Sequence, residues 1–257
     1  MTIKAIQWNM GGGKLLKQGE DPTLIASYSV DGINEIADFI KTHSPDIVTL
    51  QEVQSNKTYN QAKLLAEKTG LQYWFYDTAS ESHKDKGNRL GMAILTRFPG
   101  SNHSFKLFFN PKYEHIWEDG SIATSYDKGI TTATLHISTK LTLDVQTLHL
   151  IPFRRFGIDA LSDSAKEHRK DVASKIGTGY EPFLIQGDFN FDDESLMDFL
   201  PIIFKSGLQE VKQQKATTPK GRKYDHVLYK GLVLKSSRTE ANVLTDHYPI
   251  ITEFEVP

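Results

Sequence analysis

The segment FLIQGDFNFDD, residues 183–193, places several oxygen-bearing side chains directly after an apolar run. Gly, Asp and Asn commonly form turns, and Asp192 or Asp193 is expected to cap a helix that begins near residue 194. A turn and a cap do not require Asp188 and Asn190, whose i, i+2 spacing can aim both side chains toward the same side. Asp188 and Asn190 are therefore the first candidates for chemistry.

Similar side chains stand at the ends of other strand-like segments. These further candidates are Asn9, Glu52, His149, Asp225, Asp246 and His247. Each one alone is more often structural than functional, because turns use Asn and Asp so frequently. Together, however, carboxylates, amides and imidazoles are the groups that bind a hard cation and move protons beside it. The set predicts a metal-assisted reaction at the strand ends.

The elements that must position these side chains alternate between strands and helices. Strand-like runs occur at residues 3–8, 46–51, 71–76, 91–96, 129–137, 141–150, 183–186, 224–229 and 248–256. Helical patterns occur at 33–40, between 62 and 70, at 159–176 and after 193. Because a meander of strands separates the alternating parts, we expect an α/β protein with mixed sheets covered by helices.

The composition is that of an ordinary globular domain. A chain of 257 residues can build one large core, so we expect a single domain over residues 1–257 that acts as a monomer. The net charge of -2 excludes a global basic field, and the lack of cysteine excludes a thiolate metal site or nucleophile. Without a signal-like start or a membrane-length apolar run, a cytoplasmic location and no membrane partner are expected.

Seven short motifs connect these candidates to a known family. They are WNMGGG, TLQEV, GMAILTRFP, TLHL, GDFN, YDHV and TDHYPI, in that order. The chain thereby resembles the endonuclease/exonuclease/phosphatase superfamily of DNase I-like metal-dependent phosphoesterases, from Asn9 to about Ile250. GDFN and the Asp-His-Tyr-Pro element are the specific motifs. The resemblance implies a four-layered α/β sandwich with two facing mixed sheets flanked by helices.

The resemblance also implies which residues bind metal and activate water. Glu52 would be the principal ligand of Mg²⁺, with Mn²⁺ as an alternative; Asn9 would lie beside it and Asp246 would contribute from the far side. Asp188 would orient and deprotonate the attacking water with help from Asn190. Such a cation is needed because a phosphodiester is an anion that repels nucleophiles.

Two histidines have implied roles at the phosphate. His247 would hydrogen-bond the scissile phosphate and would be oriented by Asp225. His149 would stabilise developing charge or protonate the leaving oxygen. In DNase I-like nucleases an upstream acid pairs with this second imidazole, and Glu81 and Asp85 are the candidates for it here.

Some neighbouring segments are expected to be structural. Strand alternation directs His226 away from Asp225, so we expect a solvated or supporting histidine. The aromatic segment 105–120 could stack on bases or insert into lipid, but a strand pair that closes the core is the favoured interpretation. GGGK at 11–14 lacks P-loop spacing and is expected to be a flexible turn.

Basic residues near the candidates suggest the substrate. Arg154, Arg155, Arg222 and Lys223 are candidates for phosphate-backbone contacts. His149, where apurinic endonucleases have Tyr, favours DNase I-like relatives. We therefore predict an enzyme, a Mg²⁺-dependent phosphodiesterase that acts as a DNA endonuclease or exonuclease. The alternatives are a phosphatase or sphingomyelinase-type hydrolase of the same fold, and a non-catalytic nucleic-acid-binding domain.

Overall fold

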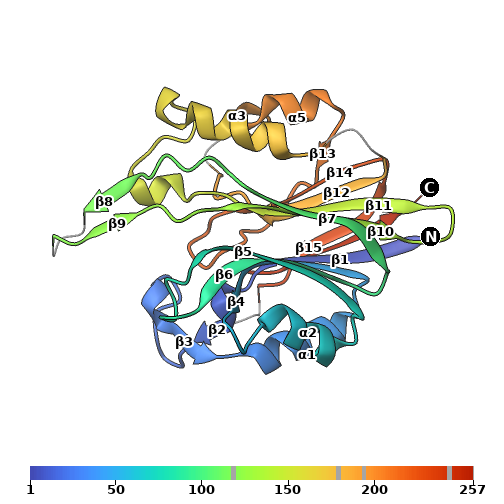
Figure 1. Ribbon diagram of the computed structural model, residues 1–257, viewed down its shortest axis with the longest axis horizontal. Coiled ribbons are helices and arrows are strands. Elements are labelled where there is room, and N and C mark those ends of the chain that lie inside the picture. Colours follow the sequence, from blue (N-terminus) through green and yellow to red (C-terminus); the bar gives the residue numbers. More distant parts are fainter. Residues whose placement is uncertain (117–119, 178–180, 193–194, 242–244, 257) are drawn as a thin grey trace.

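Two mixed sheets face each other in the computed structural model, which describes residues 1–116, 120–177, 181–192, 195–241 and 245–256 (Figure 1). The first sheet has the order β15 (Val233–Thr239), β16 (Ile250–Glu255), β1 (Thr2–Asn9), β4 (Ile47–Ser55), β6 (Arg89–Thr96) and β5 (Tyr73–Glu81). The second has the order β13 (Gln209–Glu210), β14 (Asp225–Lys230), β12 (Phe183–Asp188), β11 (Thr142–His149), β10 (Gly129–His136) and β7 (Gly100–Leu107). The pairs β1–β4 and β11–β12 are parallel.

Helices cover the outer face of each sheet. On the first sheet lie α1 (Ile33–His43) and α2 (Gln61–Thr69), and on the second lie α3 (Lys166–Lys175), α4 (Leu196–Phe199) and α5 (Pro201–Lys205), as Figure 1 shows. Buried apolar residues form one core between the sheets and one under each helical layer. This arrangement confirms the predicted four-layered sandwich.

Short elements connect the layers at the end of the molecule where β1 and β12 finish. They are η1 (Gly11–Gly13), β2 (Lys14–Leu16), η2 (Ile25–Ser27), β3 (Tyr28–Asp31), β8 (Glu114–Ile116), β9 (Ile122–Thr124), η3 (Phe153–Phe156) and η4 (Asp163–Ala165). Within the described ranges, no helix is long and apolar enough to cross a membrane.

The strand registers gather the predicted side chains. His149 pairs with Asp188 across β11 and β12, and Asp188 pairs with Asp225 across β12 and β14. In the first sheet, Asn9 at the end of β1 pairs with Gln51, the residue before Glu52. Because the two sheets face each other, these strand ends meet at one edge of the sandwich.

Two edge strands and one helix differ from the sequence prediction. β7 and β15 were not predicted because their sequences, GSNHSFKL and VLKSSRT, are polar and only partly buried. The helix predicted at 159–176 is shorter, since a 3₁₀ turn at Asp163–Ala165 precedes α3.

Local predictions around the GDFN segment also need correction. The N-cap of α4 is Ser195, whose Oγ accepts a hydrogen bond from Met197 N, while Asp192 accepts one from Lys223 N instead. Asp193 lies outside the described residues. His226 is buried rather than solvated, because its ring nitrogens contact Glu210 Oε1 at 2.8 Å and Phe191 O at 2.9 Å.

The segment 105–120 does not form the predicted strand pair by itself: the end of β7 pairs with β10, and β8 pairs with β9, which follows the segment. Phe108 is buried, but Ile116 and Ile122, which face each other across the β8–β9 ribbon, are 68% and 61% exposed. Figure 1 shows this ribbon projecting from the edge of the sandwich. The apolar side chains of the ribbon therefore face outward.

Candidate active site

A buried carboxylate lies at the centre of the site. Asp188 Oδ2 accepts a hydrogen bond from Asn9 Nδ2 at 2.9 Å, and its Oδ1 accepts one from Asn190 N at 2.9 Å. The Asn190 side chain donates to Leu150 O, and its positive φ of 50° turns the chain sharply after the strand. Burial raises the pKa of Asp188 to about 7, and the negative charge of Asp225 adds to this effect. Asp188 can therefore accept a proton near neutral pH.

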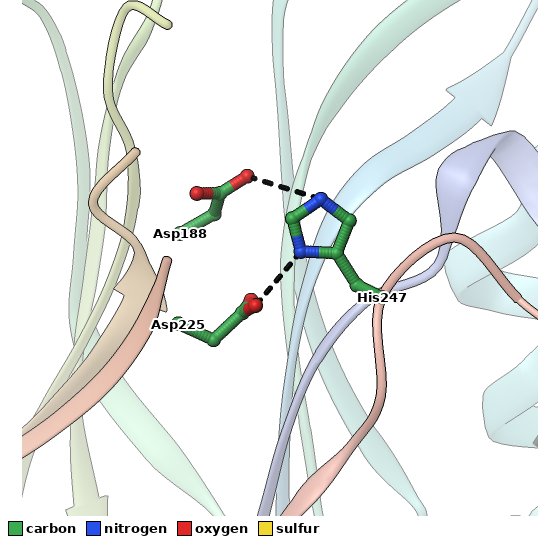
Figure 2. Close-up of side chains that lie close together, drawn as sticks. All are labelled: Asp188, Asp225 and His247. Atoms are coloured by element: carbon green, nitrogen blue, oxygen red, sulfur yellow. Dashed lines mark hydrogen bonds and ion pairs between the residues drawn. The ribbon is translucent and has the colours of Figure 1, made fainter. Parts of the chain in front are cut away.

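His247 lies between two carboxylates from the neighbouring strands, as Figure 2 shows. Its Nδ1 donates to Asp225 Oδ2 at 2.7 Å, and its Nε2 lies 3.8 Å from Asp188 Oδ2. Burial disfavours the charged ring, but Asp225 and Asp188 outweigh it and raise the pKa of His247 to about 10. The predicted pairing of His247 with Asp225 is thus present, and the ring is protonated at pH 7.

Asp225 is itself held by buried polar side chains between the sheets. Gln7 Nε2 donates to Asp225 Oδ1 at 3.0 Å and also to Gln51 Oε1 at 2.6 Å. Gln51 Nε2 in turn donates to Thr147 Oγ1 at 2.8 Å. Since these contacts cross from one sheet to the other, they fix the relative position of the two halves of the site.

His149 contacts Lys128 and Asp188, and neither of the two acids proposed as its partner. Lys128 Nζ lies 3.1 Å from both ring nitrogens of His149, whose Nε2 is 3.3 Å from Asp188 Oδ2. Glu81 instead pairs with Arg89, and Asp85 with Lys14 and Gln54, so neither predicted partner reaches the ring. Burial, reinforced by Lys128, holds the pKa of His149 well below its usual range. His149 is therefore neutral at pH 7, and burial also lowers the pKa of the Lys128 amine beside it.

The predicted metal ligands offer oxygen atoms without partners. Glu52 is the bulged residue between Gln51 and Val53 in the β4–β6 pairing, and its φ of 54° is in the left-handed region. A bulge of this kind redirects a side chain, here into the site. Glu52 Oε2 and Asp246 Oδ1 are both buried and have no hydrogen-bond partner. Buried carboxylate oxygens without a hydrogen bond are costly, so the pair fits a bound divalent cation.

A second group of carboxylates and an imidazole is close enough together to hold a metal ion, but its ligand atoms already form hydrogen bonds. Among the described residues, ligand atoms of Asp188, Asp225 and His247 lie within 4.8 Å of one another. Each of them is already hydrogen-bonded within the protein. The oxygens without a hydrogen bond favour Glu52 and Asp246 as metal ligands. Asn9 is less available, because its Nδ2 donates a hydrogen bond to Asp188 and its Oδ1 accepts one from Gly11 N.

The ammonium of Lys84 partly balances the negative charges of Glu52 and Asp246. Its Nζ lies 3.3 Å from Asp246 Oδ2 and 3.9 Å from Glu52 Oε2. Burial opposes ionisation of Glu52, yet Lys84 and the neighbouring cations hold its pKa well below its usual range. Both carboxylates consequently face a positive charge that any bound cation must share or displace.

The triple glycine at 11–13 forms the predicted turn, which is buried and hydrogen-bonded. All three glycines are buried with positive φ, and Gly12 O accepts hydrogen bonds from Gln54 and Gln61. A Cβ on Gly11 would collide with Asp246 Oδ1. Glycine is required there because Asp246 packs directly against the backbone.

Gly11→Ala is therefore expected to weaken Mn²⁺ binding about tenfold and to cost about 1 kcal/mol of stability. Gly19→Ala is the matched control, since Gly19 also has positive φ (83°) but nothing within 4 Å of an added Cβ. It should show a similar stability loss with unchanged Mn²⁺ affinity. Calorimetric titration and thermal unfolding measure both effects, and equal loss of affinity in the two variants would contradict this role for Gly11.

A cavity of about 700 Å³ is lined by the central candidates Asn9, Glu52, His149, Asp188, Asn190, Asp246 and His247. Arg154, Arg155 and Arg222 line it, as predicted, together with Lys220. Lys223 does not, because its Nζ donates to Gln213 O at 2.8 Å. The structure therefore places Lys223 outside this cavity.

Sequence analysis missed several residues of this cavity or left them without a role. They are Tyr28, His83, Lys84, Tyr126, Lys128 and Tyr224. His83 and Lys84 belong to the loop between β5 and β6, and Lys128 directly precedes β10. Their position next to strand ends is the one signal in the sequence that could have indicated them.

Comparisons with known proteins agree with this architecture. The protein resembles the endonuclease/exonuclease/phosphatase from Beutenbergia cavernae DSM 12333, with a TM-score of 0.75 and 17% identity over 99% of this chain and 72% of that chain. It also resembles the catalytic domain of human Nocturnin with bound sulfate, with a TM-score of 0.65 and 16% identity over 100% of this chain and 94% of that chain. These likenesses establish a DNase I-like fold.

Sequence comparison gives the family. A UPF0294 protein of Vibrio campbellii (strain ATCC BAA-1116) is 30% identical over 117 residues, which cover 44% of this chain and 40% of that relative. Residues 6–247 match the Endonuclease/Exonuclease/phosphatase family. The chain therefore belongs to that family, whose members are hydrolytic phosphoesterases.

Proposed function

We propose that this protein hydrolyses phosphodiester bonds in nucleic acid, with DNA as its substrate and a divalent cation, Mg²⁺ or Mn²⁺, as its cofactor. The observation that carries the proposal is that Asp188, whose pKa is near neutral, lines the same cavity as Glu52, His247 and the arginines. One chain is sufficient, because these candidate groups surround one cavity. The alternative of a non-catalytic binding domain does not account for a buried base beside a protonated imidazole.

The described side chains can divide the reaction between them. Asp188 accepts a proton from water as the water oxygen bonds to phosphorus, and protonated His247 donates a hydrogen bond to a non-bridging oxygen. Asp225 holds the His247 ring in orientation. A cation at Glu52 and Asp246 would supply further positive charge to the phosphoryl oxygens.

The leaving oxygen needs a proton or a positive charge as its bond to phosphorus breaks. Neutral His149 can donate a hydrogen bond to it, and the Lys128 ammonium beside the ring carries both charge and proton. In this proposal Lys128 shares the role that the family resemblance implies for His149. Lys128 Nζ lies 3.1 Å from both ring nitrogens, so its charge stands directly against the ring of His149.

The arginines support a substrate with more than one phosphate. Arg155→Gln is expected to raise KM about tenfold with a smaller change in kcat, because a contact to a flanking phosphate contributes equally to substrate and transition state. Lys223→Gln is the control, since the Lys223 ammonium binds Gln213 O. Steady-state cleavage of a labelled oligonucleotide at several salt concentrations measures the effect. A KM that rises equally in both variants would contradict it.

A phospholipid hydrolase is the second candidate, and exposed apolar side chains near the cavity favour it. Ile25 lines the cavity and is half exposed, and Leu24 beside it is more exposed. In the β8–β9 ribbon, the exposed Ile122 directly precedes Ala123 and Thr124, which line the cavity. Such groups can enter a lipid surface. Parallel assays with duplex and single-stranded oligonucleotides and with sphingomyelin or phosphoinositide vesicles separate the two functions. Turnover of lipid alone would replace the nuclease proposal.

A further inference from the structure

His83 is a third imidazole in the cavity and has no role in the proposed reaction. It lies in the loop between β5 and β6, is mostly buried, and its ring stacks on Tyr126 with centroids 5.4 Å apart and planes at 28°. Ser82 Oγ accepts hydrogen bonds from Lys84 N and Asp85 N, both at 3.1 Å. These contacts hold the loop, so the ring is oriented before any ligand arrives.

The position of this imidazole suits a shared metal ion. His83 Nε2 lies 4.0 Å from Glu52 Oε2, the buried carboxylate oxygen that has no hydrogen-bond partner. Two ligand atoms that each lie about 2.1 Å from one ion can be separated by up to about 4.2 Å. The distance is too long for a hydrogen bond and within the range for two ligands of the same cation.

We propose that His83 supplies a nitrogen ligand to the cation held by Glu52, so that the site selects Mn²⁺ or Co²⁺ over Mg²⁺. Imidazole nitrogen suits transition-metal ions, whereas Mg²⁺ takes oxygen ligands and water. This inference rests on the metal site of the proposed function and specifies its metal.

Lys84 strengthens the expected selectivity. Its ammonium lies against both Glu52 and Asp246 and therefore opposes every divalent cation through its charge. Mg²⁺ gains little from His83 to offset this repulsion, while a transition-metal ion gains a coordinate bond. The combination predicts weak Mg²⁺ binding and stronger Mn²⁺ binding by the same residues.

Metal binding, measured without any substrate, tests the inference. Calorimetric titration of wild-type protein should give at least about tenfold tighter binding of Mn²⁺ and Co²⁺ than of Mg²⁺. His83→Gln should weaken Mn²⁺ and Co²⁺ binding about tenfold or more and leave Mg²⁺ binding within about twofold. His103→Gln is the matched control, because His103 pairs with Asp77 at 2.7 Å and does not line the cavity. It should change none of these affinities.

Pulsed electron paramagnetic resonance of Mn²⁺-loaded protein provides a readout that does not depend on a variant. A ¹⁴N coupling in the wild type that disappears in His83→Gln is the expected result. A wild-type spectrum without nitrogen coupling, or equal Mn²⁺ affinity in wild type and His83→Gln, would overturn the inference. If Glu52→Gln abolishes metal binding but His83→Gln does not change it, only the role of His83 fails. If no divalent cation binds the wild-type protein, the metal in the proposed function fails as well.

Discussion

Asp188→Asn is expected to lower kcat about 10³-fold, because asparagine retains the shape of the side chain but cannot accept the proton of the attacking water. The fold should survive. The pKa of Asp188 in the folded protein is raised from its ordinary value of 3.8 to about 7. Ionised Asp188 therefore lowers the free energy of unfolding, and this loss grows as pH rises from the lower to the higher pKa. A neutral asparagine removes that cost, and the variant should unfold at the same or a higher temperature at pH 8.

Asp144→Asn is the matched control for this substitution. Asp144 belongs to the neighbouring strand β11 but pairs with Phe183, at the opposite end of β12 from Asp188. Its carboxylate accepts a hydrogen bond from Thr134 and does not line the cavity. Single-turnover rates and thermal unfolding of both variants provide the comparison. A rate for Asp188→Asn within about tenfold of the wild type would rule out Asp188 as the base.

His247→Gln is expected to lower kcat about 10²- to 10³-fold, because the substitution removes the charged donor to the phosphoryl oxygen. Asp225→Asn should reduce kcat in the same direction by weakening the orientation and charge of the ring. Since Asp225 acts through His247, the double variant should be no slower than His247→Gln alone. Additive losses would show that Asp225 has a separate function.

The pH dependence of kcat/KM gives a second test of this pair. The wild-type rate should rise as Asp188 loses its proton near pH 7 and fall only as His247 loses its proton near pH 10. Burial lowers the pKa of His247 and Asp225 raises it, so Asp225→Asn should move the alkaline fall to lower pH. An alkaline limb that does not move in Asp225→Asn would contradict the assignment.

Local sequence patterns predicted mixed sheets and a site at the strand ends, and the family resemblance predicted the four-layered sandwich. The alternation of apolar strands and helices indicated mixed sheets, and polar residues at strand ends indicated where chemistry would gather. The registers His149–Asp188 and Asp188–Asp225 then bring the predicted side chains together. The pairing of Asp225 with His247 is also present as predicted.

What could not be predicted depends on loop geometry. Asp85 lies two residues from His83, yet it faces Lys14 and Gln54 rather than His149, and no period in the segment specifies that direction. Lys128 reaches His149 only because β10 and β11 are paired, which makes Gly129 the partner of His149. Lys223 is adjacent to Arg222 but turns toward Gln213.

The measurement that tests metal-dependent phosphodiester cleavage most directly is conversion of supercoiled plasmid to nicked and linear forms in Mg²⁺ or Mn²⁺. Wild-type protein should nick the plasmid, and nicking should disappear in EDTA and in Asp188→Asn but persist in Asp144→Asn. Folded, metal-loaded wild-type protein that leaves plasmid and labelled oligonucleotides intact would contradict the nuclease proposal. Nicking that persists in EDTA or in Asp188→Asn would contradict the metal and the base, respectively.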